Sequence, residues 1–233
     1  MQPEPDPDAK WVASLAGCSA ARSSLFLRET VGERRLFRHL AREHTRERRS
    51  SYVEIDAPRE LGALVRLLRP RHVVEVGVSS GVSSAYILEA LDQNGVGTLH
   101  SVDLPSTPSR TARGRSSTGR SWTLPAGRSS GWAVPFPLRK RWDLRLGDKK
   151  AVLPLLAEEL AEIDLFLYDV PHEDESAFRE FLCLDARMPS GAVAIADHGP
   201  RGNLCNALRR WARTRGGAPL RRRGLGLFGF RCA

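Results

Sequence analysis

The feature that most constrains this fold is a regular alternation of short apolar strands and helices from residue 58 onward. The strand-like runs are HVVEV, TLHSVD, WDLRL, IDLFLY and AVAIAD, and helices are expected over 58–69, 82–92, 149–161 and 173–187. Such an alternation predicts a parallel sheet with helices on both faces. A last run, LGLFGF, has no crossover helix and predicts an antiparallel C-terminal strand at the sheet edge. We therefore expect an α/β protein with a Rossmann-like, doubly wound, mostly parallel sheet.

The first part of the chain, residues 1–57, has a different pattern. The acidic, proline-rich start MQPEPDPDAK predicts a frayed tail. Residues 9–50 carry apolar side chains at helical intervals, and Gly32 is expected to divide them into two helices. We expect a tail and helical cap over 1–57 and the Rossmann-like domain over 58–233. The cap either covers a ligand site or forms a homodimer contact.

Residues 105–141 interrupt the alternation with a stretch rich in Ser, Arg, Gly and Pro, where a helix would normally connect two strands. Inserted loops of this length are functional lids or disordered segments. Trp122, Trp132 and Phe136 favour packing near the site for the second half. Together with Trp142 they form an aromatic wall for a flat ligand, or else they serve plain packing.

Composition and charge exclude some classes of protein. No apolar run approaches the roughly 20 residues of a membrane span, so no membrane partner is expected. The N-terminus lacks the basic and apolar regions of a secretory signal, which favours a cytoplasmic protein. The formal net charge is +9, yet the arginines are spread over many segments, so a nucleic-acid partner is not favoured. The four cysteines lack metal-site spacing, and reduced thiols are expected.

The stretch VVEVGVSSGVSS, residues 73–84, reads as a buried strand that enters a ligand loop. Its glycines, Gly77 and Gly81, are more widely spaced than in a dinucleotide-binding turn, which must be tight around a pyrophosphate. The loop instead suits a ligand with an amino-acid head. Its carboxylate would meet the loop amides and the hydroxyls of Ser79 and Ser83, while Glu75 would organise the loop or reach the ammonium through water.

Two further markers lie at the ends of the next strands. Asp103 ends TLHSVD, where a carboxylate can accept both hydrogens of a ribose diol. Gly147 and Asp148 follow WDLRL, at a natural place to contact an adenine edge. A loop for an amino-acid head, an acid for a ribose and a corner for adenine together describe S-adenosylmethionine.

With these residues in place, the chain resembles class I S-adenosylmethionine-dependent methyltransferases from about residue 58 to its end. SVDLP, GWAVPFPLRKRWDLRLGD and LPLLAEELAEIDLFLYD further resemble a bacterial small-molecule O-methyltransferase subfamily related to macrocin O-methyltransferases and cephalosporin hydroxylase-type proteins. The resemblance implies methyl transfer to a small-molecule acceptor, at a hydroxyl, in specialised-metabolite (natural product) biosynthesis.

The same resemblance points to two strand ends for the chemistry. In YDVPHEDESAFRE, Asp169, His172 and Glu180 occupy the subfamily's Asp, His and Glu positions, and Asp169 also borders the cofactor site. In IADHGPRGN, Asp197 keeps the first of two acids that related enzymes use to bind a divalent cation, whereas His198 replaces the second. Hard Mg²⁺ prefers oxygen ligands, so the replacement favours Mn²⁺ or Fe²⁺ if Asp169, Asp197 and His198 bind a metal.

Three alternatives stay open at this point. Catalysis without a metal would use His172 or His198 as the general base, because an imidazole titrates near neutrality. An RNA methyltransferase would use the positive charge. A repurposed member would bind the cofactor without transferring its methyl group. Of the other histidines, His100 is expected in the core and His39 and His44 at the solvent surface.

Overall fold

The structure is a computed structural model that describes residues 6–32, 34–46, 58–105, 124, 127–170, 174–197, 204–222 and 227–233. Its helices are α1 (Pro7–Ala16), α2 (Ala20–Gly32), α3 (Arg34–Arg46), α4 (Pro58–Leu68), α5 (Val82–Asn94), the 3-10 helix η1 (Phe136–Arg141), α7 (Lys149–Glu159), α8 (Asp174–Asp185) and α9 (Leu204–Thr214). Its strands are β1 (His72–Val76), β2 (Thr98–Asp103), β3 (Trp142–Leu146), β4 (Leu165–Tyr168), β5 (Val193–Ala196), β6 (Leu220–Arg221) and β7 (Phe228–Arg231).

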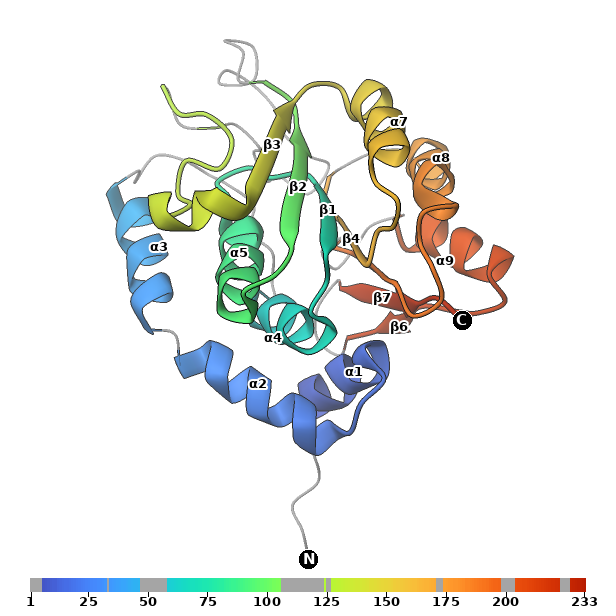
Figure 1. Ribbon diagram of the computed structural model, residues 1–233, viewed down its shortest axis with the longest axis horizontal. Coiled ribbons are helices and arrows are strands. Elements are labelled where there is room, and N and C mark those ends of the chain that lie inside the picture. Colours follow the sequence, from blue (N-terminus) through green and yellow to red (C-terminus); the bar gives the residue numbers. More distant parts are fainter. Residues whose placement is uncertain are drawn as a thin grey trace, which may run out of the picture.

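The sheet confirms the predicted fold class. It has seven strands in the order β3-β2-β1-β4-β5-β7-β6, and β1 to β5 are parallel (Figure 1). The chain leaves β1 toward β2 on one side and returns to β4 on the other, so the order reverses between β1 and β4. Open parallel sheets bind ligands at the carboxyl ends of strands beside such a reversal.

The antiparallel C-terminal strand is confirmed, but its predicted position at the edge was wrong. β7 lies between β5 and β6 and is antiparallel to both. The edge strand β6 is only two residues long, Leu220 and Arg221, and both are exposed. A strand of two exposed residues has no apolar pattern from which it could be predicted.

The sheet divides the core into two halves, and alternate residues of its central strands point into one half or the other. Val73 and Leu165 belong to the half that packs against α4 and α5, whereas Val74 and Phe166 belong to the half beneath α7, α8 and α9. The two helical layers lie on opposite sides of the sheet in Figure 1. None of the helices within the described ranges is long and apolar enough to cross a membrane.

The N-terminal helices begin earlier than expected. α1 starts at Pro7, and Asp6 caps it by accepting a hydrogen bond from Asp8 N at 3.0 Å, so the frayed-tail prediction is wrong from residue 7 onward. The break at Gly32 is confirmed, and a second break, with a left-handed Gly17 (φ +66°), separates α1 from α2. The division of the chain at residue 58 stays a prediction.

Candidate active site

The loop between β1 and α5, residues 77–81, is shaped by two glycines with left-handed backbones. Gly77 (φ +93°) lies so close to the end of β4 that a Cβ there would be 2.0 Å from the Asp169 carbonyl oxygen. Gly81 (φ +90°) precedes α5, and a Cβ there would be 2.5 Å from Val134 Cγ2. A glycine at the start of a helix often lets the helix begin close to the preceding strand. What approaches Gly81 is instead the chain around residue 134.

Glu75 organises the interior of this loop. Its side chain is fully buried in β1 and accepts hydrogen bonds from the hydroxyls of Ser83, Ser84 and Ser101, each at 2.6 Å. Burial raises the pKa of Glu75, and the three hydroxyl donors oppose that shift. The Ser83 hydroxyl, which was expected to face the ligand, donates to Glu75 instead.

Asp103 ends β2 beside the same loop and is buried. Its Oδ2 accepts hydrogen bonds from Ser79 N at 3.2 Å and from Ser130 Oγ at 2.7 Å, and its Oδ1 accepts one from Leu104 N at 2.8 Å. Ser79 has a left-handed backbone (φ +51°), which is uncommon for a residue other than glycine. The structure thus brings together Gly77, Ser79 and Asp103 as the sequence predicts.

The predicted adenine corner lies next to Asp103. Gly147 N donates to the Asp103 carbonyl oxygen at 2.8 Å. Asp148 is exposed and caps α7 by accepting a hydrogen bond from Lys150 N at 2.9 Å. Asp148 therefore has a structural role as a helix cap, and its contact with adenine stays a prediction.

Asp169 and Asp197 directly follow the adjacent parallel strands β4 and β5. Tyr168 pairs with Ala196 in the sheet register, and Asp197 N donates to the Tyr168 carbonyl oxygen at 3.1 Å. The two acids are therefore placed at neighbouring strand ends, and β4, which precedes Asp169, is the neighbour of β1. The candidate bases His172 and His198 both lie outside the described residues, so their roles stay predictions.

The metal prediction lacks support in the part of the chain that the structure describes. Among those residues, no group of three or more His, Cys, Asp or Glu side chains is arranged to hold an ion. Asp169 and Asp197 are described, but the third predicted ligand, His198, is not.

Glu180 does not have the place in the site that the resemblance suggested. It is buried in α8 and accepts hydrogen bonds from Lys149 Nζ at 2.6 Å, from Ser176 Oγ at 3.0 Å and from the Tyr168 hydroxyl. Burial, followed by the contact with Glu180, raises the pKa of Tyr168, so its phenol remains protonated. This cluster joins α7, β4 and α8 beneath the strand ends.

The second half of the inserted segment packs near the site, as expected. Residues 127–135, here called the strap, bond to the β1–α5 loop through Gly131 N to the Ser79 carbonyl oxygen at 2.8 Å and Ala133 N to the Ser80 carbonyl oxygen at 3.0 Å. The cap reaches the strap too, because His39 Nε2 lies 3.0 Å from the Ala133 carbonyl oxygen.

The aromatic residues of this region do not form one wall. Phe136 is 84% exposed. Trp142 lies directly behind Gly131 and donates from Nε1 to Ser101 Oγ at 2.8 Å. Trp132 contacts the ring of His44, with ring centroids 5.1 Å apart, so His44 is not simply solvent-facing. Trp122 lies outside the described residues.

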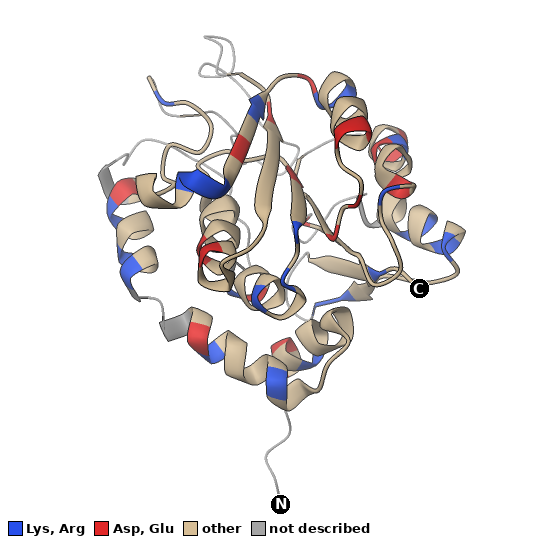
Figure 2. Ribbon diagram, viewed as in Figure 1, with Lys and Arg blue, Asp and Glu red and all other residues tan. Residues whose placement is uncertain are grey.

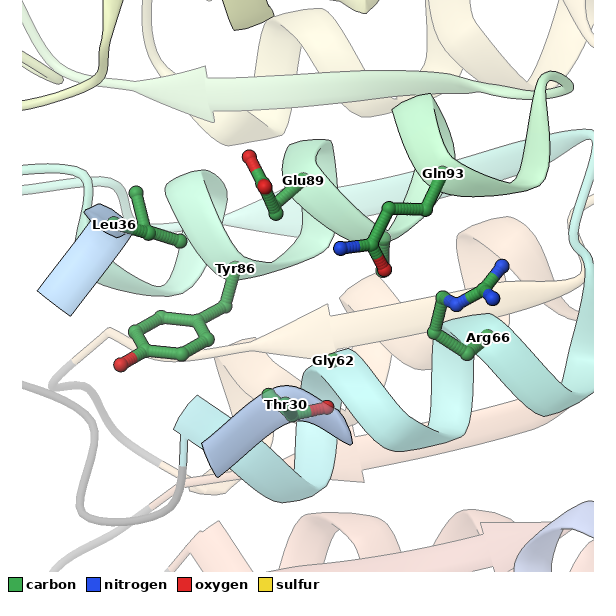
Figure 3. A pocket seen from close by; sticks show the side chains of 8 residues that line it. Thr30, Leu36, Gly62, Arg66, Tyr86, Glu89 and Gln93 are labelled. Carbon is green, nitrogen blue, oxygen red and sulfur yellow. The ribbon is translucent and has the colours of Figure 1, made fainter. Parts of the chain in front are cut away.

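A hollow elsewhere in the molecule is not a second candidate site. It lies between α2, α3, α4 and α5, and Thr30, Gly62, Arg66 and Tyr86 are among the residues around it (Figure 3). Its volume of about 10 Å³ leaves room for a single water molecule. No methyl donor would fit there.

The fold and the loop geometry define a methyltransferase-like α/β protein, and the comparison with protein families agrees. Residues 74–198 match the family described as Methyltransferase domain, and this chain belongs to that family. The match runs from β1 to the end of β5, so it includes the loop, Asp103 and both strand-end acids.

Solved structures share the fold at low sequence identity. A methyltransferase from Geobacter sulfurreducens has a TM-score of 0.56 at 18% identity, covering 85% of this chain and 88% of that one. An O-methyltransferase from Bacillus cereus in complex with S-adenosylhomocysteine has a TM-score of 0.53 at 16% identity, and the match covers 83% of this chain and 88% of that one. The Streptomyces achromogenes O-methyltransferase TomG, bound to S-adenosylmethionine, has a TM-score of 0.54 at 15% identity, and the match covers 85% of this chain and 89% of that one. A search of curated proteins found no match.

Proposed function

We propose that this chain transfers the methyl group of S-adenosylmethionine to a hydroxyl of a small molecule in specialised-metabolite biosynthesis. The observation that carries the proposal is the position of Asp103 beside the loop 77–81, at the carboxyl ends of β1 and β2. A carboxylate there can accept both hydrogens of a ribose diol. The two glycines of the loop make room for the main chain at Asp169 and for Val134, which lets the loop keep its path beside Asp103.

The similar structures support the same donor. The Bacillus cereus O-methyltransferase holds the demethylated product, and TomG, which is involved in tomaymycin synthesis, holds the donor itself. Their fold can therefore serve methyl transfer to oxygen in natural product chemistry. The homodimer expected through the N-terminal helices remains a prediction that sedimentation can measure.

The reaction is an in-line displacement. The acceptor oxygen attacks the methyl carbon, a C–O bond forms as the C–S bond breaks, and S-adenosylhomocysteine leaves as a neutral thioether. The acceptor proton must pass to a base as the oxygen attacks. We assign the base to His172 or His198, because histidine is the side chain most often used as a general base near neutral pH. Asp169 and Asp197, at the neighbouring strand ends, would favour the imidazolium that forms, and no step is assigned to a metal.

Calorimetric titration with S-adenosylhomocysteine tests the donor site. Asp103→Asn keeps the size of the side chain but replaces one acceptor oxygen with a donor. We expect it to weaken binding about 10- to 100-fold, since hydrogen bonds to a charged group contribute roughly 1.5–3 kcal/mol. Equal affinity of the variant and the unaltered chain would contradict the placement of the ribose at Asp103.

The assignment of the base needs a different measurement. His198→Gln and His172→Gln, assayed for methyl transfer to a panel of hydroxylated acceptors, should bind S-adenosylhomocysteine as the unaltered chain does. Loss of the general base should lower turnover about 100-fold or more in one of the two variants. If both variants retained full turnover, neither histidine would be the base.

A further inference from the structure

The strap is held on one side by the β1–α5 loop and on the other side by η1. Besides the bonds from Gly131 and Ala133 to the loop, Arg139 of η1 braces the strap from behind. Its guanidinium donates to the carbonyl oxygens of Gly131 at 3.3 Å and Val134 at 3.1 Å. The strap therefore has a defined main-chain path next to the loop, and a side chain that it extends toward Asp103 starts from a fixed position.

That side chain is Ser130. It is only 4% exposed, and its hydroxyl donates to Asp103 Oδ2 at 2.7 Å. The same oxygen accepts a hydrogen bond from Ser79 N, while the Ser79 carbonyl oxygen accepts one from Gly131 N. Ser79, Asp103 and residues 130–131 thus close a ring of hydrogen bonds. This ring holds Ser79 in its left-handed conformation, which is unfavourable for a residue with a side chain.

We propose that Ser130 is a positioning residue for the ribose of the methyl donor, a role that rests on the function proposed above. Asp103 accepts hydrogen bonds from the Ser130 hydroxyl, from Ser79 N and from Leu104 N, and together these bonds fix the direction in which its carboxylate faces a ribose. With its rotamer fixed before the ligand arrives, Asp103 loses less side-chain entropy on binding. The strap, which belongs to the segment inserted between β2 and β3, thereby becomes part of the donor site.

The test compares two ligands and two variants by calorimetry. The ligands are S-adenosylhomocysteine and its 2′-deoxyribose analogue. The variants are Ser130→Ala and the control Ser129→Ala, which removes the hydroxyl of the neighbouring exposed residue. We expect Ser130→Ala to weaken binding of S-adenosylhomocysteine about tenfold, the scale of one charge-assisted hydrogen bond. Its preference for the ribose over the deoxyribose ligand should also narrow, while Ser129→Ala should match the unaltered chain.

The ratio of the two affinities does not depend on the fraction of folded protein, so it remains informative if Ser130→Ala is destabilised. An unchanged affinity and ratio would overturn the role of Ser130. Tighter binding would overturn it too, since it would show that Ser130 competes with the ribose for Asp103. If the unaltered chain bound neither ligand, the proposed function would fail, and the role of Ser130 with it.

Discussion

At the scale of single residues, the site depends on places where a side chain would not fit. The sequence signals both glycines of the loop, but it does not say what they approach. Gly77 makes room for the main chain at Asp169, which arrives from β4, and Gly81 makes room for residues 131–134. These contacts join segments that are distant in the sequence, so only the fold reveals them.

A matched pair of glycine variants separates the close approach from the backbone conformation. Gly77→Ala adds a Cβ 2.0 Å from a main-chain oxygen at φ +93°, whereas Gly95→Ala meets no atom within 4 Å at φ +71°. We expect Gly95→Ala to cost about 1 kcal/mol, for the left-handed backbone alone. Gly77→Ala should cost about 3 kcal/mol or more, because the crowded main chain must also shift. Urea unfolding measures both, and equal losses would contradict the close approach.

At the scale of elements, the sequence predicts best what the buried strands dictate. The five parallel strands, their crossover helices and the acids at the ends of β2, β4 and β5 all follow from local apolar runs and the residues after them. The sequence does not predict how α1 is attached to the rest of the molecule, because charged side chains make that attachment. Only the start of α1 lies outside the predicted helical segment of residues 9–50, because its acidic, proline-rich first residues resemble a tail, although Asp6 before Pro7 is a helix-start signal.

α1 is joined to the rest of the molecule by a buried ionic cluster. Arg222, which follows β6, donates at 2.8 Å to Asp8 of α1 and at 2.8 Å to Glu60 of α4. Arg59 also pairs with both acids. Glu60 is fully buried and Arg222 is 8% exposed, so water cannot replace the bonds of the guanidinium. The cluster ties both ends of the chain to α4.

Removing the central cation should therefore be costly. Arg222→Ala leaves Asp8 and Glu60 close together, with Arg59 as the one cation that pairs with both among the described residues, and we expect a loss of about 3 kcal/mol in the free energy of unfolding. Arg213→Ala, on the exposed surface of α9, serves as the control and should change stability by less than about 0.5 kcal/mol. Chemical denaturation measures the free energy of unfolding of both variants. Similarly small losses of stability in the two would show that α1 does not depend on the cluster.

At the scale of the whole molecule, the positive charge is distributed rather than gathered. Figure 2 shows Lys and Arg on α3, on η1 and on α9, while α7 and α8 carry many acidic residues. Several of the arginines have local partners, such as Arg210 with Glu175 and Arg215 with Asp185. These pairs leave the net charge of +9 unchanged, but they give some of the arginines a local structural role.

The response of the whole molecule to acid should depend on a pair of histidines on the α7 side of the sheet. His72 Nδ1 lies 3.2 Å from His100 Nε2, and His100 Nδ1 lies 3.0 Å from Asp143 Oδ2, so His100 is satisfied in the core as the sequence predicts. Burial, followed by the charge of His100, lowers the pKa of His72. Asp164 opposes that shift and Arg71 adds to it, while Arg145 and Glu159 complete the cluster around Asp143.

Because the pKa of His72 is lower in the folded than in the unfolded chain, the unfolded chain binds more protons as pH falls through about 6.5. The free energy of unfolding should therefore be highest above pH 7 and decrease between pH 7 and 5, before the carboxylates titrate. His72→Gln removes the titrating group and should flatten this decrease, although it also removes the contact with His100. Urea unfolding at pH 7.5, 6.5 and 5.5 measures the slope, and an equally steep decrease in the variant would exclude His72 as its source.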